Sequence, residues 1–419
     1  MSRKLVFLTN ILSHYQLSLS EEFIRIYGNG YLFIATEPFH QEMIDYGVKD
    51  LNQKPFVMRT YESTEIHAQA MKEAEESECL IICGIPVDAG MVQRRAEKGK
   101  ITFLYSERPL KPVFRDRPVL EAVRKIKRIA YARFMPRRNE SLMRRLAGSS
   151  RKFFLLCSGA FVAHDFRLMG LFNGSAYRWG YFPAMKNYDS IEALIARKNP
   201  ASILWAGRCI SWKHPEYAVR VAANLRDKGA NFNMKIIGSG EMLDTLRGMI
   251  DAMNLGGYVE LAGSMPPDSV RKEMESSQIF LFTSDSHEGW GCVLNEAMNS
   301  GCAVIAGEKI GAVPYLIQHG HNGIIFREKD IDGLSRITES LLNDSELSSR
   351  LGREAYMTVA GEWNPKTAAE RFAELSADLA RGGEGCIFTE GPCSPAPLMR
   401  DSWFREQAHN TPQNMESSI

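Results

Sequence analysis

Short runs of apolar residues, many of them β-branched, recur along this chain of 419 residues and restrict the folds it can adopt. Five precede residue 160: "KLVFLT", "YLFIAT", "CLIICG", "ITFLYS" and "KFFLLC". About six follow residue 200: "SILWAG", "MKIIG", "YVELAG", "IFLFT", "CAVIAG" and "GIIF". Between most of them lie segments with helical periodicity, such as 215–227 and 241–254. Continuous apolar strands that alternate with amphipathic helices are typical of parallel sheets covered on both faces.

The polar segment 183–201, which is punctuated by proline, separates the two sets of strands and is expected to be a linker. We therefore predict an α/β protein with two doubly wound, Rossmann-like domains that face a cleft. The first domain is expected over 1–185 and the second over 200–362. One more helix, 366–380, is expected within 363–381. Residues 382–419 are rich in Gly, Pro, Ser and Asn, with little periodicity, and are expected to form a disordered tail.

Composition excludes several classes of protein. Apolar residues make up 44% and charged residues 24%, which is ordinary for a soluble globular chain. The net charge of +1 does not favour a nucleic-acid partner. The eight cysteines show no zinc-binding Cys-x-x-Cys pair, and we expect buried free thiols. No signal peptide is apparent, and no apolar stretch reaches the ~20 residues that span a bilayer. A cytoplasmic location is expected, either free or peripheral on the inner face of the membrane.

The segment 287–301, "HEGWGCVLNEAMNSG", carries the main candidate site. A strand over 279–283 leads into a loop over 284–291, a helix follows from about Cys292, and strand 302–306 comes next. Such a loop leaves the carboxyl end of a parallel strand, where open α/β sheets bind ligands. The helix start offers free N–H groups to phosphate oxygens. Glu288 lies in the loop and Glu296 about one turn into the helix, and a carboxylate suits the vicinal hydroxyls of a sugar or a ribose.

Three further strand ends are expected at the same edge of this sheet. In "ILWAGRCISWKH", Arg208 and Lys213 follow a strand and could hold a diphosphate. In "MKIIGSGEM", Gly238 and Gly240 form a tight turn. In "VELAGSM", a flat base could lie against the backbone at Gly263.

Together these motifs resemble the retaining glycosyltransferases of the GT-B fold, family 4, strongly over about 200–326 and loosely to 380. The resemblance implies a nucleotide-diphosphate sugar as co-substrate, with no separate cofactor and no metal. It implies that Arg208 and Lys213 hold the diphosphate, that Glu288 contacts the transferred sugar, and that Glu296 binds the ribose. It also implies that the last helix, 366–380, crosses back to the N-terminal domain. The expected catalytic residues are Glu288, Lys213 and Arg208. The donor-binding set is Arg208, Lys213, Gly238, Gly240, Gly263, Glu288, Gly289, Trp290, Gly291, Cys292 and Glu296.

The N-terminal half departs from the family pattern. Where the family often has paired glycines after the first strand, this chain reads "TNILSHYQ", and His14 is the polar candidate. After strand 101–106 it reads "YSERPLK", so that Ser106, Glu107 and Arg108 are expected to face the cleft. His14 and Glu107 are the candidates on the acceptor side. The runs "HYQ", "YSER" and "YRWGYFP" resemble enzymes of bacterial surface-polysaccharide assembly, so the acceptor is expected to be a saccharide or a lipid-linked saccharide.

Residues 111–152 hold 14 Lys or Arg and 3 Asp or Glu, a local excess of 14 − 3 = +11. Apolar residues from Val119 to Phe134 fall on one helical face, and Arg124, Lys125 and Arg128 fall on the other. A basic amphipathic helix is typical of contact with an anionic membrane. An ordinary helix with a solvated face and a nucleic-acid patch are the alternatives.

The same residues also bear on other possible functions. A dinucleotide-dependent oxidoreductase needs a third glycine where "GSGEML" has Leu243. A metal-dependent transferase would use an acidic pair such as Asp330 and Asp332, but these residues open a helical stretch and are expected to cap it. A non-catalytic sugar-nucleotide-binding subunit and a sugar-nucleotide epimerase of the same fold remain alternatives.

Overall fold

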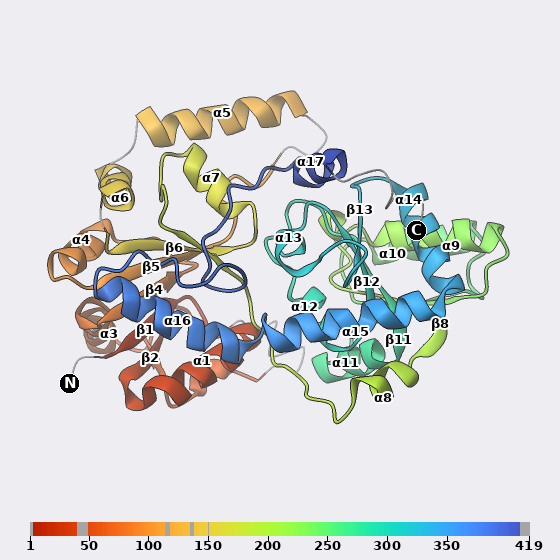
Figure 1. Ribbon diagram of the computed structural model, residues 1–419, viewed down its shortest axis with the longest axis horizontal. Coiled ribbons are helices and arrows are strands. Elements are labelled where there is room, and N and C mark those ends of the chain that lie inside the picture. Colours follow the sequence, from red (N-terminus) through yellow and green to blue (C-terminus); the bar gives the residue numbers. More distant parts are fainter. Residues whose placement is uncertain (1–2, 40–48, 114–117, 135–137, 150, 411–419) are drawn as a thin grey trace. The chain divides into compact units, whose positions relative to one another are not determined.

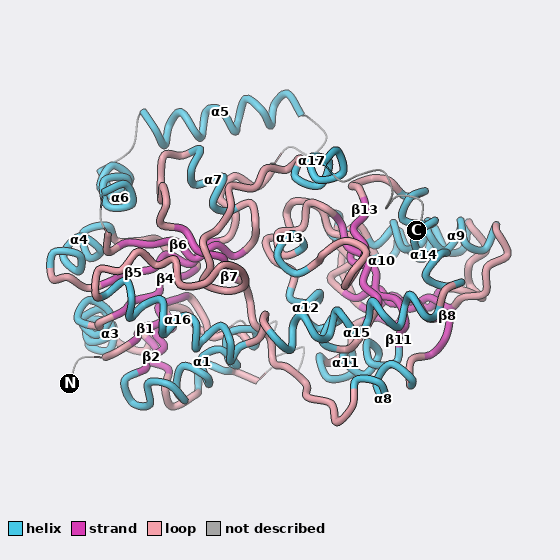
Figure 2. The backbone as a smooth tube through the Cα atoms, in the orientation of Figure 1, coloured by secondary structure: helices cyan, strands magenta, loops and turns pink. Residues whose placement is uncertain are grey.

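The computed structural model describes residues 3–39, 49–113, 118–134, 138–149 and 151–410. The chain divides into two compact units. The first unit contains residues 1–184 and 362–400, and the second contains 185–361 and 401–419. Each unit is built around one parallel sheet with helices around it (Figures 1 and 2). The α/β class and the doubly wound architecture predicted from the sequence are confirmed.

The first unit has a seven-stranded sheet in the order β3-β2-β1-β4-β5-β6-β7, and all of its pairs are parallel. The strands are β1 Leu5–Thr9, β2 Tyr31–Ala35, β3 Val57–Arg59, β4 Cys79–Cys83, β5 Ile101–Ser106, β6 Phe153–Ser158 and β7 Ala176–Trp179. The helices are α1 His14–Tyr27, α3 Thr64–Glu76, α4 Ala89–Glu97, α5 Pro118–Phe134, α6 Arg138–Ser149, α7 Val162–Leu168 and α16 Pro365–Ala380.

The second unit has a six-stranded parallel sheet in the order β10-β9-β8-β11-β12-β13. The strands are β8 Asn199–Ala206, β9 Asn233–Ile237, β10 Val259–Gly263, β11 Ser277–Phe282, β12 Ala303–Gly307 and β13 Ile324–Phe326. The helices are α8 Ile191–Ala196, α9 Pro215–Asp227, α10 Leu243–Ala252, α11 Pro267–Ser276, α12 Cys292–Asn299, α13 Val313–Leu316, α14 Ile331–Asn343, α15 Ser345–Gly361 and α17 Trp403–Asn410.

In each sheet the strand order reverses beside the first strand of the unit. The reversal lies between β1 and β4 in the first unit and between β8 and β11 in the second. In open α/β sheets such a switch point is where the loops at the carboxyl ends diverge and leave room for a ligand. The topology therefore predicts one binding edge in each unit.

Helix α16 belongs to the first unit although it follows the whole second sheet in sequence. Its buried Phe372 packs against Phe23 of α1, Phe103 of β5 and Trp179 of β7, with ring centroids 5.0–5.8 Å apart. The family resemblance implied that helix 366–380 crosses back to the N-terminal domain, and the aromatic cluster holds α16 in the first unit.

Two expectations about the first unit are wrong. The sequence predicted five strands before residue 160, whereas six are present, and β7 follows. The predicted disordered tail is ordered from Gly382 to Asn410, and residues 411–419 lie outside the described residues. Arg178 N donates to Ser394 O at 2.7 Å and Ala396 N donates to Ala176 O at 2.9 Å, so that the tail pairs with the edge of β7. Cys393 is completely buried there.

The structure also bears on the predictions about the cysteines and about membrane-spanning segments. Seven of the eight cysteines are buried free thiols and Cys386 is exposed. Among the described residues, no helix combines the length and the apolar character needed to cross a membrane.

Candidate functional site

The candidate site lies at the switch point of the second sheet, where the loops after β8 and β11 run side by side. These loops, 207–214 and 283–291, lead into α9 and α12. Asp285 N donates to Trp212 O at 3.0 Å, and the Thr283 hydroxyl donates to Lys213 O at 2.7 Å. Trp205 Nε1 in turn donates to Thr283 Oγ1 at 2.8 Å. Buried polar groups therefore hold the two loops together.

Lys213 and Glu288 meet at this edge. The Lys213 ammonium forms an ion pair with Glu288 Oε2, and their side chains are only 13% and 10% exposed. Ser284 Oγ also donates to Glu288 Oε2, at 3.0 Å. The structure thus brings together the cation predicted to hold a diphosphate and the acid predicted to hold a sugar.

The second predicted cation, Arg208, is exposed. Its guanidinium carbon lies 5.6 Å from the ring centroid of Trp212, and Lys213 Nζ lies 4.7 Å from the same ring. An indole face attracts cations and leaves their N–H groups free to reach a ligand. Trp212 therefore holds both cations in one neighbourhood.

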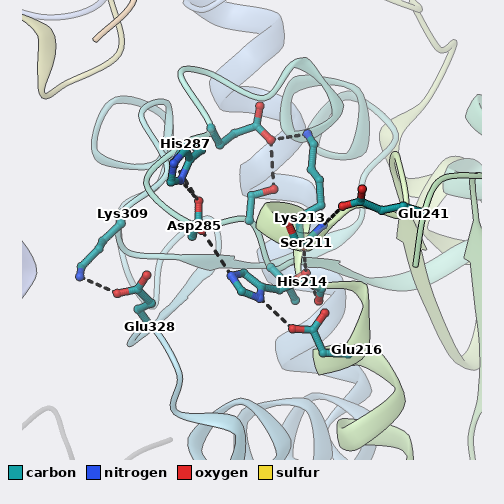
Figure 3. Close-up of polar contacts among 12 residues, drawn as sticks. Ser211, Lys213, His214, Glu216, Glu241, Asp285, His287, Lys309 and Glu328 are labelled. Carbon is teal, nitrogen blue, oxygen red and sulfur yellow. Dashed lines mark hydrogen bonds and ion pairs between the residues drawn. The ribbon is translucent and has the colours of Figure 1, made fainter. Parts of the chain in front are cut away.

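A charged network that the sequence reading missed lies beneath Lys213. His214 Nδ1 lies 2.8 Å from Glu216 Oε1, and its Nε2 lies 3.4 Å from Asp285 Oδ2 (Figure 3). His287 donates its backbone N–H to Asp285 Oδ1 at 2.8 Å, and its ring Nδ1 lies 2.8 Å from the same atom. Burial alone would lower the pKa of His214, but the two carboxylates raise it to about 9. At neutral pH an imidazolium therefore lies at the start of α9.

The glycines at the neighbouring turns serve the close approach of these loops. Gly238 has φ of +146°, and a Cβ there would lie 1.8 Å from Gly207 O. A Cβ on Gly240 would lie 2.5 Å from Cys209 O. Gly263 differs, because a Cβ there would meet no atom within 4 Å. Gly238 and Gly240 thus fit the backbone together, whereas Gly263 borders open space.

The loop before α12 contains candidate ligand-binding residues and residues that hold the loop in place. Gly291 precedes α12 with φ of +91°, and a Cβ there would lie 2.2 Å from the Phe282 ring. Gly289 and Cys292 are buried. Trp290 was predicted to bind the donor, but its side chain is 1% exposed and donates to Asn295 Oδ1 at 2.8 Å. Its role in this structure is to fasten the loop to α12, because a buried indole has no free face for a ligand.

Glu296 lies on α12, after the first turn. Burial raises the pKa of its carboxyl to about 7, against the opposing positive charge of Arg271. Arg271 donates to Glu296 O at 2.9 Å and also pairs with Asn299 Oδ1. The sequence reading missed Arg271, since α11 shows no motif that distinguishes it from a surface cation.

The two acceptor-side candidates come together at the carboxyl edge of the first sheet. Glu107 accepts a hydrogen bond from Tyr181 Oη at 3.2 Å and lies 2.5 Å from Lys111 Nζ. Tyr181 and Tyr15 have ring centroids 6.5 Å apart, and the rings of Tyr15 and His14 have centroids 3.7 Å apart with their planes tilted by 44°. Burial lowers the pKa of His14. A neutral imidazole, aromatic rings and a carboxylate therefore share one edge.

Other predicted polar residues have structural roles. Arg108 was expected to face a cleft, but it is 7% exposed and its Nε lies 2.9 Å from Asp165 Oδ2. A buried arginine needs such a partner, and it binds Asp165 of α7 instead of a ligand. Asp330 accepts from Gly333 N at 2.8 Å, which confirms its predicted capping role. Within the described residues, no group of three or more His, Cys, Asp or Glu is arranged to hold a metal ion.

Comparison with known proteins finds a likeness in the second unit. Residues 189–358 match the family described as glycosyl transferases group 1. The match covers less than half of the chain, and it agrees with the resemblance noted in the sequence.

Curated relatives are similar over less than half of this chain. The amylovoran biosynthesis glycosyltransferase AmsK of Erwinia amylovora is 28% identical over 48% of this chain and 50% of its own length. A GDP-mannose-dependent alpha-(1-6)-phosphatidylinositol monomannoside mannosyltransferase of Mycobacterium tuberculosis is 24% identical over 42% of this chain and 46% of its own length. The chain spans about half the length of these curated relatives.

Solved structures share the fold over nearly the whole chain. HepE of Anabaena, determined with UDP and glucose, has a TM-score of 0.61 at 16% identity and covers 90% of this chain and 99% of its own. A glycosyltransferase of Rickettsia africae has a TM-score of 0.61 at 14% identity, over 91% and 100% of the two chains. The two-domain GT-B fold is therefore confirmed.

Proposed function

We propose that this protein is a glycosyltransferase that moves a sugar from a nucleotide-diphosphate donor to a saccharide or lipid-linked saccharide acceptor. The observation that carries the proposal is the pairing of Lys213 with Glu288 at the switch point of the second sheet. The names of similar proteins support it, since AmsK acts in amylovoran biosynthesis and HepE has been determined with UDP-glucose. The wider assignment to glycan or polysaccharide biosynthesis rests on the same likeness.

The chemistry follows from where charge develops. As the glycosidic bond breaks, negative charge grows on the leaving diphosphate and positive charge grows on the sugar ring. Arg208, Lys213 and the first N–H groups of α12 would stabilise the diphosphate, and preorganised groups of this kind usually supply the largest catalytic effect. Glu288 would release Lys213 to the phosphate and accept the sugar hydroxyls. These cationic groups would serve in place of a metal, and retention of the anomeric configuration is expected from the family.

The acceptor is proposed to bind at the first sheet, near His14 and Glu107. The aromatic rings beside them suit the apolar faces of a sugar, and Glu107 suits its hydroxyls. Contact of residues 111–152 with an anionic membrane is part of the same proposal, because it would bring the enzyme to a lipid-linked acceptor. Residues 114–117, 135–137 and 150 of this segment lie outside the described residues.

A transfer assay with Lys213→Ala and Glu288→Ala tests the donor site. Each variant should lose about 10²–10³ in rate, by analogy with lost oxyanion donors. The matched control is Lys228→Ala, because Lys228 pairs with Glu339 at the opposite end of α9. Near-normal transfer by either site variant, with the folded state intact, would remove the assignment.

Product analysis separates the alternatives. A non-catalytic binding subunit would bind the nucleotide sugar without releasing nucleotide, and an epimerase would return a nucleotide sugar with an altered sugar. Transfer that persists in EDTA, with a product of unchanged anomeric configuration, would support the metal-independent retaining mechanism.

A further inference from the structure

We propose that helix α5, Pro118–Phe134, docks on the surface of an anionic lipid bilayer with its apolar face inserted. The proposal rests on the membrane contact proposed above and deepens it, because it names the helix, the inserted face and the class of lipid, and it is tested without turnover. It commits to lipid as the partner and excludes a second copy of the chain and nucleic acid.

The exposed apolar side chains of the described structure are concentrated on and beside this helix. Ten large hydrophobic residues are exposed, and seven of them lie within 113–134. The seven are Val113, Val119, Leu120, Val123, Ile126, Tyr131 and Phe134. The other three, Met357, Ile387 and Leu398, are scattered over other segments. Concentrated exposure of this kind marks an interaction surface, whereas isolated exposed residues are ordinary.

The exposed side chains form a stripe with helical spacing. Val119, Val123, Ile126 and Phe134 recur at intervals of three, four or eight residues and share one face of α5. Their exposed fractions are 75%, 43%, 65% and 78%. Figure 1 shows α5 at the periphery of the first unit. The face that would be expected to cover a core is therefore turned outward.

Polar contacts hold α5 to the unit without using the stripe. Arg133 Nε donates to Leu168 O of α7 at 2.7 Å. Arg124 donates to Lys111 O at 2.7 Å and pairs with Glu121, whose Oε2 accepts from Val113 N at 2.8 Å. Arg144 of α6 donates to Ala132 O. These bonds fix the orientation of the helix and leave the stripe accessible.

The charge of the helix selects the partner. Its residues include five Lys or Arg and one acid, Glu121, which Arg124 already neutralises. Lys127 is exposed and lies at the border of the stripe, whereas Arg128 lies on the opposite face. An exposed cation beside an inserted apolar stripe matches an interface of anionic headgroups over acyl chains. A nucleic acid would use the cations but not the stripe, and a second copy would bring like charges together.

The experiment is vesicle sedimentation with the full chain. Vesicles of phosphatidylcholine alone are compared with vesicles that also contain phosphatidylglycerol. The wild type should bind the anionic vesicles, and binding should weaken with salt. The charge variant Lys127→Glu and the apolar variant Val123→Ser/Ile126→Ser/Phe134→Ser should each lower the partition coefficient by at least about tenfold.

Two control variants match these changes elsewhere on the surface. Met357→Ser/Leu398→Ser removes exposed apolar residues, and Arg336→Glu/Lys366→Glu reverses exposed charges. Both should bind anionic vesicles like the wild type. All variants change exposed residues, and circular dichroism checks that each is folded.

Three results would overturn the proposal. One is equal binding to neutral and anionic vesicles. Another is loss of binding in the charge variant but not in the apolar variant, which would indicate purely electrostatic contact. The third is a dimer of the wild type, seen by light scattering, that the apolar variant converts to monomer. Vesicle binding is scored apart from sugar transfer, so that failure of membrane docking and failure of the transfer reaction are distinguishable.

Discussion

His214 shows at the scale of one residue how the donor site maintains positive charge. Its backbone is left-handed, with φ of +50°, and its ring lies between Glu216 and Asp285. The pKa of about 9 exceeds the ordinary value of 6.5, so that the imidazolium stabilises the folded state fully below pH 6.5. This contribution is lost as the pH rises towards 9.

We therefore expect the wild type to lose about 1–2 kcal/mol of stability between pH 6.5 and 9 through this residue. His214→Asn should remove that dependence, since asparagine tolerates the left-handed backbone. Thermal unfolding at both pH values measures the difference, at roughly 2–4 °C per kcal/mol. His321→Asn, which changes an exposed histidine of the same unit, is the control. An unchanged pH dependence in His214→Asn would contradict the assigned network.

At Glu296 the fold disfavours the charged form, whereas at His214 it favours the charged form. Its folded pKa of about 7 lies above the ordinary 4.5, so that stability falls as the pH rises from 4.5 to 7, and the full penalty remains above 7. Glu296→Gln should raise the thermal midpoint at pH 8 and leave it unchanged at pH 4. The same variant should weaken binding of a nucleoside diphosphate about tenfold, measured by calorimetry, if the carboxylate holds the ribose. A variant that gains stability and keeps full affinity would show that Glu296 is not a ligand.

At the scale of elements, the glycine turn between β9 and α10 determines where the cationic loop lies. Gly238→Ala should cost about 2–4 kcal/mol, because its Cβ would collide with Gly207 O and its φ is unfavourable for alanine. Gly248→Ala is the matched change in neighbouring α10, where a Cβ meets no atom within 4 Å. It should stabilise the protein by about 0.5–1 kcal/mol. Equal midpoints for the two variants in thermal unfolding would contradict this account.

The elements also show what could be predicted from the sequence. Buried central strands are recognisable in the sequence as continuous apolar runs, and every run quoted from the sequence forms a strand. The two strands that were missed, β3 and β7, are the two edges of the first sheet. "VMR" and "AYRW" are short and contain arginine, because an edge strand needs less apolar surface.

The candidate site was predictable where the strand order brings residues together, and not where side-chain packing does. Lys213 and Glu288 follow strands that a doubly wound order places side by side, so that their pairing follows from topology. The contacts of His214 with Asp285 and of Arg108 with Asp165 depend on side-chain packing between distant segments, which no local pattern encodes. The burial of the Trp290 side chain was not predictable for the same reason, since the sequence does not show whether a loop tryptophan faces a ligand or the core.

At the scale of the whole molecule, the C-terminal segment contributes to both units. Residues 382–400 cover the edge of β7, where Tyr177 bridges Pro395, and α17 lies in the second unit. Trp403 is 6% exposed there, and its Nε1 donates to Glu308 O at 2.8 Å. Phe404 contacts His319, with ring centroids 5.4 Å apart. The segment is therefore a structural part of each unit.

Graded truncation tests this assignment. A chain ending at Arg400 loses α17 alone, so that the second unit should unfold at a lower temperature while the first is unchanged. A chain ending at Arg381 also uncovers β7, and an unpaired edge strand is a template for association. This shorter chain should lower the unfolding temperature of both units and aggregate on heating. Differential scanning calorimetry measures the unfolding transitions. Phe372→Leu, a change within the core of the first unit, identifies the transition that belongs to that unit. The edge of β7 is uncovered only in the shorter chain. Equal aggregation of both truncated chains would therefore show that residues 382–400 do not protect this edge.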